Sequence, residues 1–264
     1  KDITLQQIRS KEMAEVFTPT WLCNSQNNLI DNVWFGRKNV FNIEENVDNI
    51  SKTWSANPEK ICFPKDKSWK DYILDNRLEI TCGEAPYIIS RYNTSTGNLI
   101  PIENRIGLLD RKLRMINENV ETSGEWLRAV QSAYKSIYAF EWQGDSLFLA
   151  REAMLITFIE NFKYKFNKNP QPKSVKYIAY IISWNIWQMD GLKGVIPNSC
   201  KKKVSTSYNL FGETISREIT CKGCIENNIH KHNGIYSKIK DWTKKDLETG
   251  KLGRKIKFVN MLKS

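Results

Sequence analysis

Half of the cysteines and both histidines of this sequence lie in one segment near its carboxyl end. The segment contains Cys200, Cys221, Cys224, His230 and His232. Two residues separate Cys221 from Cys224, a spacing typical of thiolates that bind one tetrahedral metal ion. Cys200 precedes them by a distance that suits a β excursion returning to the site, and either His230 or His232 would complete four ligands. We therefore expect structural zinc; the alternative is that these residues are unrelated members of a basic β region.

Three acidic residues lie where strands are expected to end, namely Glu79, Glu141 and Asp190. In an open parallel sheet, ligands bind beyond the carboxyl ends of the strands. Glu141 can accept hydrogen bonds from both hydroxyls of a ribose, and the following Trp142 can cover a purine ring. Asp190 can accept from an exocyclic amine. Together these residues predict a nucleoside-containing cofactor; the alternative is that the acids are structural.

Alternating strands and helices must position these acids. Strands are predicted over residues 78–82, over 136–142 and up to 190. Helices are predicted over residues 105–118, 123–136 and 144–166, and from residue 174 onward. This alternation predicts an α/β domain with a mainly parallel sheet.

The two ends of the chain differ from this central pattern. Residues 1–16 have helical periodicity, and a second helical spacing of apolar residues follows at Trp21, Leu22, Leu29, Val33 and Trp34. After Pro197 the sequence changes to short β-like runs separated by turns. We therefore expect a cofactor-binding domain with a helical N-terminal region over residues 1–197, and a small β-rich segment over residues 198–264.

The positive charge of the chain is concentrated in the C-terminal segment. The net charge is +11, and residues 198–264 contain 15 Lys and Arg against 6 Asp and Glu. Such a segment favours a polyanionic partner, most simply DNA; the alternative is a solvated lysine face. The aromatic residues among these lysines would stack on bases or form the segment's own core. They are Tyr208, Phe211, Tyr236 and Trp242.

Membrane association is not expected. The sequence contains no run of about 18 apolar residues, and it does not open with a signal-peptide pattern. We expect a soluble, cytoplasmic protein with no membrane partner.

Four stretches of the chain resemble the motifs of adenine-N6 DNA methyltransferases of the restriction–modification, modification-subunit type. Phe17-Thr18-Pro19 is similar to the motif that opens this family. Residues 79–85, Glu-Ile-Thr-Cys-Gly-Glu-Ala, resemble the family's Asp-Pro-Ala-Cys-Gly-Ser-Gly loop. The segment around Glu141 resembles the second motif, and "SWNIWQMDGLKG" resembles the third. The resemblance covers roughly residues 11–195.

The resemblance implies a Rossmann-like S-adenosylmethionine-dependent methyltransferase sheet with helices on both faces. It also implies cofactor contacts from Phe17, Thr18, Pro19, Glu79, Thr81, Cys82, Gly83, Glu141, Trp142 and Asp190. Gly83 is the only glycine in a loop where phosphate-binding loops carry two or three. S-adenosylmethionine has no phosphates, so this loop remains compatible with it. Glu84 stands where the family has a small hydroxyl residue.

The family's catalytic (Asn/Asp)-Pro-Pro-(Tyr/Phe) motif has no counterpart, because the chain has eight prolines and no Pro-Pro pair. The resemblance therefore implies a DNA methyltransferase, or one subunit or portion of it. Its partners would be DNA and other restriction–modification subunits or a second methyltransferase chain. The alternative is a catalytically inactive, methyltransferase-fold subunit that binds DNA or supports assembly.

Overall fold

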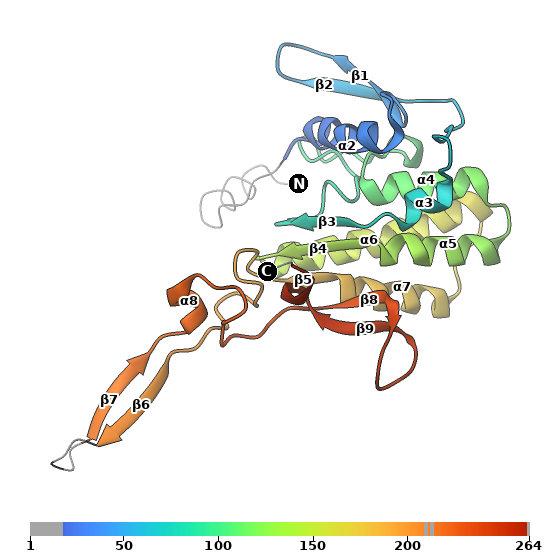
Figure 1. Ribbon diagram of the computed structural model, residues 1–264. Coiled ribbons are helices and arrows are strands. Elements are labelled where there is room, and N and C mark those ends of the chain that lie inside the picture. The colour runs from blue at the N-terminus through green and yellow to red at the C-terminus, as the bar shows by residue number, and fades with distance from the viewer. Residues whose placement is uncertain (1–17, 209–210, 212–213, 263–264) are drawn as a thin grey trace.

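The central element of the protein is a three-stranded parallel sheet. The computed structural model describes residues 18–208, 211 and 214–262 (Figure 1), so the helix expected over 1–16 and Phe17 lie outside the described residues. The sheet consists of β3 (Arg77–Ile80), β4 (Ile137–Glu141) and β5 (Ile186–Gln188), in the spatial order β3-β4-β5. The predicted mixed α/β class is confirmed.

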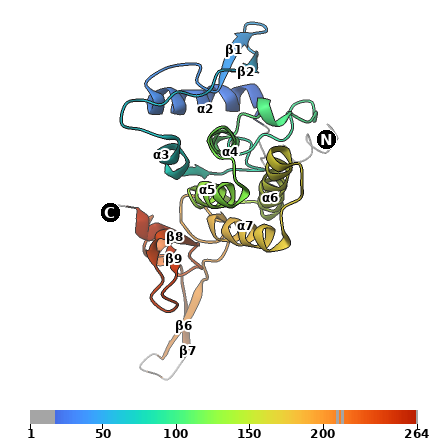
Figure 2. The ribbon, with the colours of Figure 1, turned by 90° about the vertical axis from the view of Figure 1, so that its right-hand side faces the viewer.

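Two helices precede each return to the sheet. The chain passes through α4 (Leu108–Asn119) and α5 (Ser123–Lys135) before β4, and through α6 (Gly144–Phe166) and α7 (Pro172–Asn185) before β5. The N-terminal end of α5 is capped by Thr122, whose side chain accepts a hydrogen bond from the backbone of Glu125. Helices α5, α6 and α7 form one layer (Figure 2). The main core lies between this layer and the sheet, and it includes Trp126, Phe158, Ile137, Ala139 and Ile186.

The opposite face of the sheet is covered by C-terminal strands, where the resemblance implied helices. These strands are β8 (Lys238–Lys245) and β9 (Leu252–Lys257), followed by the 3-10 helix η2 (Phe258–Met261). The rings of Phe140 and Phe258 lie 4.5 Å apart, and Met189 and Ile239 complete this second core. The Tyr138 hydroxyl donates to a backbone carbonyl of β8 at 3.0 Å. The physical reason is that Tyr138 and Phe140 present an apolar face that the hairpin can bury.

The N-terminal part packs above the sheet through both apolar and polar contacts, and Phe35, Phe41 and Tyr72 belong to the main core. It contains α2 (Thr20–Phe35), the antiparallel pair β1 (Asn42–Asn46) and β2 (Lys52–Ala56), α3 (Trp69–Leu74) and the 3-10 helix η1 (Ile102–Asn104). In α2 the side chains of Asn24, Asn27 and Asp31 are buried, whereas Leu29 and Val33 are 65% and 85% exposed. The apolar spacing therefore predicted the helix but not the face that packs inward.

A second hairpin extends away from the rest of the molecule. It is formed by β6 (Lys203–Tyr208) and β7 (Thr214–Ile219) and is followed by the short helix α8 (Lys222–Glu226) (Figures 1 and 2). Residues 198–262 thus form two parts, a projecting hairpin with α8 and a β8–β9 hairpin on the sheet. The predicted boundary at residue 197 falls just before the first part.

Candidate functional site

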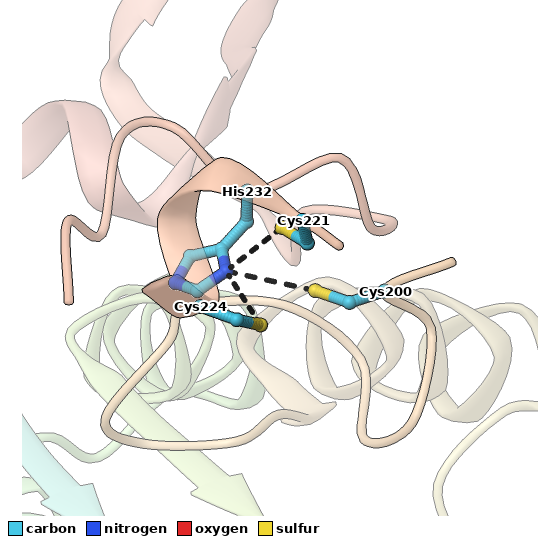
Figure 3. A group of neighbouring side chains, drawn as sticks. All are labelled: Cys200, Cys221, Cys224 and His232. Carbon is cyan, nitrogen blue, oxygen red and sulfur yellow. Dashed lines mark hydrogen bonds between the residues drawn. The ribbon is translucent and has the colours of Figure 1, made fainter. Parts of the chain in front are cut away.

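Three cysteines and one histidine converge at the base of the projecting hairpin. Figure 3 shows the side chains of Cys200, Cys221, Cys224 and His232 pointing toward one another. Their possible ligand atoms all lie within 4.8 Å of one another. The Nδ1 atom of His232 is 3.6 Å from each of the three sulfur atoms.

The local backbone explains how these side chains meet. Cys221 is the N-cap of α8 and Cys224 lies within that helix, so one turn presents both thiols to the same point. A side chain at Gly223 would meet the backbone nitrogen of His232 at 2.6 Å, so only glycine permits this close approach. The backbone N–H of His232 donates to the Tyr236 hydroxyl at 2.9 Å, which fixes the loop that carries His232.

The thiols are arranged so that one of them ionises readily. Burial opposes ionisation of Cys221, but hydrogen bonds from the backbone N–H groups of Asn233 and Cys224 and from His232 lower its pKa to about 6. Burial and the hydrogen bonds to Cys221 and Cys224 raise the pKa of Cys200 to about 11. A bound cation reverses that second effect, because thiolates are the form that binds metal.

This group can bind a metal ion such as zinc. Three thiolates and one imidazole make a complete tetrahedral set, which is typical of structural zinc and leaves no open position for a substrate. The sequence left His230 and His232 as alternatives. His232 lies in the group, whereas His230 is exposed and its backbone N–H donates to Asn228.

A cleft of about 730 Å³ lies at the carboxyl ends of β3 and β4, which is within the usual size range of small-molecule sites. Six of the predicted cofactor residues line it, namely Thr18, Glu79, Thr81, Gly83, Glu141 and Trp142. Cys82 and Glu84 line an adjoining pocket of about 80 Å³, together with several of the same residues. Glu84 accepts a hydrogen bond from the Tyr92 hydroxyl.

Two of the predicted cofactor residues within the described chain lie outside both the cleft and the adjoining pocket. Pro19 is the N-cap of α2, and its carbonyl accepts from Leu22. Asp190 is 5% exposed, and its carboxylate accepts from the backbone N–H groups of Leu192 and Lys193. The ammonium group of Lys193 lies 3.2 Å from it. Asp190 thus stabilises the turn that follows β5.

Glu141 connects the two loops that form the floor of the cleft. Its Oε2 atom accepts from the backbone N–H of Gly83 at 2.6 Å, and its Oε1 atom accepts from that of Gln143 at 2.9 Å. Each oxygen has a second acceptor position that a ligand hydroxyl can use.

The loop after β3 has an unusual backbone that the sequence reasoning did not detect. Thr81, Gly83 and Ala85 have φ angles of 64°, 55° and 65°. Positive φ is unfavourable for a β-branched residue such as Thr81. Such strained positions concentrate at binding sites, where the surrounding structure maintains them. The sequence signal that could have indicated this backbone is the single glycine, Gly83, with the small residues Thr81 and Ala85 two positions away on either side.

Glu79 is half-buried in the wall of this cleft, with its Oε2 atom inaccessible to solvent. Its Oε2 atom has no hydrogen-bond partner within the described part of the chain. Burial and the nearby carboxylate of Glu141 raise the pKa of Glu79 well above its usual value of 4.5. The side chain therefore favours its neutral, protonated form and can donate a hydrogen bond to a ligand.

This raised pKa predicts a pH-dependent effect of Glu79→Gln. A carboxyl group with a raised pKa binds its proton more tightly in the folded state, so its contribution to stability declines as pH rises above 4.5. Glu79→Gln should therefore become more stable relative to the wild type as pH rises from 4.5, with no further change below it. Urea unfolding across this interval measures the difference, with exposed Glu248→Gln as the control for losing a carboxylate. Parallel stability curves for Glu79→Gln and the wild type would contradict the prediction.

Comparison with models of known protein families, with curated proteins and with solved structures gives no match. Within residues 18–208, 211 and 214–262, no helix combines the length and apolar character needed to cross a bilayer.

Proposed function

We propose that this chain is the S-adenosylmethionine-binding portion of an adenine-N6 DNA methyltransferase of a restriction–modification system. The observation that supports this best is the position of Glu79, Glu141 and Trp142 around one cleft beyond adjacent parallel strands. Ligands of open parallel sheets bind at this edge, and an acid after the second strand suits a ribose diol. Trp142 is 39% exposed at the rim, where its ring can cover an adenine.

The chemistry of the cleft favours a ligand that donates hydrogen bonds or carries positive charge. Its lining includes Glu79 and Glu141 but, among the described residues, no lysine or arginine. A phosphate-bearing cofactor would meet the carboxylate of Glu141 without a compensating cation. The ribose hydroxyls, the ammonium and the sulfonium of S-adenosylmethionine suit carboxylates and aromatic rings such as Tyr87 and Trp142.

The open edge of the sheet supports the view that this chain is one portion of an enzyme. In the described part of the chain, β4 is the only strand paired with β3. Leu78 and Ile80 on this edge strand are 51% and 45% exposed. Further strands that pair here would bring additional residues to the mouth of the cleft. The amine-activating residues would come from such strands, in a partner subunit or a second methyltransferase chain.

A non-catalytic DNA-binding or assembly subunit is the second candidate. The observation that favours it is the absence of a Pro-Pro pair from the sequence. In both candidates the basic residues after 197 face DNA, and the metal centre stabilises the base of the projecting hairpin.

Calorimetric titration with S-adenosylmethionine tests the proposed function. We expect the wild type to bind, and Glu141→Gln and Trp142→Ala each to weaken binding about tenfold, which corresponds to ~1.4 kcal/mol. Exposed Glu248→Gln should bind like the wild type. Absence of binding by the wild type would exclude both the methyltransferase and a cofactor role for the cleft.

Transfer of a labelled methyl group to DNA adenines separates the two candidates. Transfer by this chain alone identifies a complete enzyme. Cofactor binding without transfer, followed by transfer after addition of a partner subunit, identifies one portion of it. Cofactor binding with no transfer in either case identifies the non-catalytic subunit.

A further inference from the structure

We infer that the face formed by α7 and the β8–β9 hairpin binds single-stranded nucleic acid, with Tyr177 and Tyr180 stacking on unpaired bases. The two tyrosines are three residues apart on α7 and therefore lie on the same side of the helix. Their ring centroids are 6.2 Å apart at an interplanar angle of 22°. Their side chains are 36% and 42% exposed, so both rings are accessible from solvent.

Lysines pack around these rings and make the face positive. The ammonium group of Lys240, a residue only 7% exposed, donates to the Tyr180 hydroxyl at 2.5 Å. It also lies 4.9 Å from the Tyr180 ring centroid and 5.1 Å from that of Trp184. Lys135 lies 5.4 Å from the ring of Tyr177. These contacts position the rings before any ligand binds. The exposed Lys173 and Lys176 place cations within reach of a phosphate backbone.

The α7 side of this face lacks acidic residues, although the β8–β9 hairpin contains Asp241, Asp246 and Glu248. Between Glu160 and Asp190 the sequence contains no Asp or Glu, whereas it contains Lys163, Lys165, Lys168, Lys173 and Lys176. A groove of about 460 Å³ is lined by Gln131, Lys173, Ser174, Lys176, Tyr177 and Tyr180. Charge complementarity therefore indicates a polyanion, and the exposed parallel rings favour one with unstacked bases.

Helix α7 packs beside β8 (Figures 1 and 2), so this face is continuous with the basic β8–β9 hairpin. The tail aromatic Trp242, which the sequence offered for either stacking or the core, is 9% exposed and donates to Asn185. Its ring packs edge-on against the ring of Tyr180, with the two centroids 6.2 Å apart. The inference goes beyond the proposed function and is independent of what the cleft binds.

Fluorescence anisotropy with the full chain and a labelled DNA single strand of about 12 nucleotides tests the inference. We expect Tyr177→Ala and Tyr180→Ala each to weaken binding about tenfold, and both Tyr→Phe variants to stay within about twofold of the wild type. An abasic strand of equal length should bind the wild type as weakly as the normal strand binds the Ala variants. Lys173→Gln should reduce the dependence of affinity on salt.

Photocrosslinking provides a second measurement if the Ala variants fold poorly. A strand that contains 5-iodouracil should crosslink to Tyr177 or Tyr180 of the wild type. Three results would overturn the inference: no binding of the strand by the wild type, equal affinity for normal and abasic strands, or crosslinks confined to other parts of the chain. Binding of an anionic vesicle or an acidic peptide in preference to the strand would also overturn it.

Discussion

Replacing His232 by asparagine is expected to remove one equivalent of bound metal and to abolish the ordered structure of residues 199–208 and 214–235. Among the residues between 198 and 235 whose burial the structure describes, Cys221, Gly223 and His232 are the buried ones. No described residue between 198 and 235 belongs to either hydrophobic core, so we expect the free energy of metal binding to be the main source of stability there. In zinc-finger peptides that free energy is about 10–16 kcal/mol.

His230→Asn is the matched control, because His230 lies two residues away, is exposed and is not a member of the group. Elemental analysis should find about one zinc per chain in the wild type and in His230→Asn, and none in His232→Asn. Hydrogen exchange should report loss of protection between residues 199 and 235 only. Treatment of the wild type with a chelator should give the same exchange pattern.

Equal metal content in the two histidine variants would disprove the assignment of His232. The rest of the chain should remain folded in every case, because its core is formed by other residues, among them Trp126, Phe158 and Ile182.

The metal centre illustrates what local spacing can predict. Cys221 and Cys224 are close in sequence, and a single turn of backbone brings them together, so the motif was sufficient. The choice between two histidines depends on tertiary contacts. Gly223 packs against His232, and Tyr236 accepts its backbone N–H, and neither contact has a sequence signature.

The acidic residues after the strands also differ in how far the sequence could predict their roles. Glu79 and Glu141 line the cleft because β3 and β4 are adjacent and parallel, which the alternation of elements predicted. Asp190 precedes Gly191, a pair that is typical of a turn in which the carboxylate caps nearby N–H groups. That local signal favoured the structural role found for Asp190. Phe258 packs on Phe140, a residue far away in the sequence. The sequence therefore could not predict that the C-terminal strands cover this face of the sheet.

Helix α2 shows why burial is harder to predict than helicity. Its apolar residues have helical spacing, yet Leu29 and Val33 face solvent. The inward face instead includes Cys23, Phe35 and the charged Asp31. The partner of Asp31 is Arg111, 80 residues away in α4. Burying Asp31 without its partner would leave an uncompensated charge, so the packing of α2 depends on a residue that its own sequence does not show.

This ion pair predicts the largest loss of stability from a single substitution outside the metal centre. The Nη1 atom of Arg111 lies 2.5 Å from the Oδ2 atom of Asp31, and the two side chains are 1% and 2% exposed. The Tyr72 hydroxyl donates to the other oxygen of Asp31 at 2.9 Å. Arg111 also donates to the side chains of Asn24 and Asn28 at 2.9 and 2.8 Å. Every charge in this network is therefore paired within a buried interface.

Asp31→Ala or Arg111→Met should each lower the free energy of unfolding by about 3–5 kcal/mol, because the remaining charge is left buried without its partner. Asp31→Ala combined with Arg111→Met should cost less than the sum of the two, which a double-mutant cycle measures. Glu218→Gln is the control, since its partner Lys202 forms an exposed pair at 3.1 Å, and we expect a loss of about 0–1 kcal/mol. The measurement is urea unfolding with zinc present at saturation. Additive losses in the double variant, or single losses as small as the control's, would show that the Asp31–Arg111 pair does not determine how α2 packs.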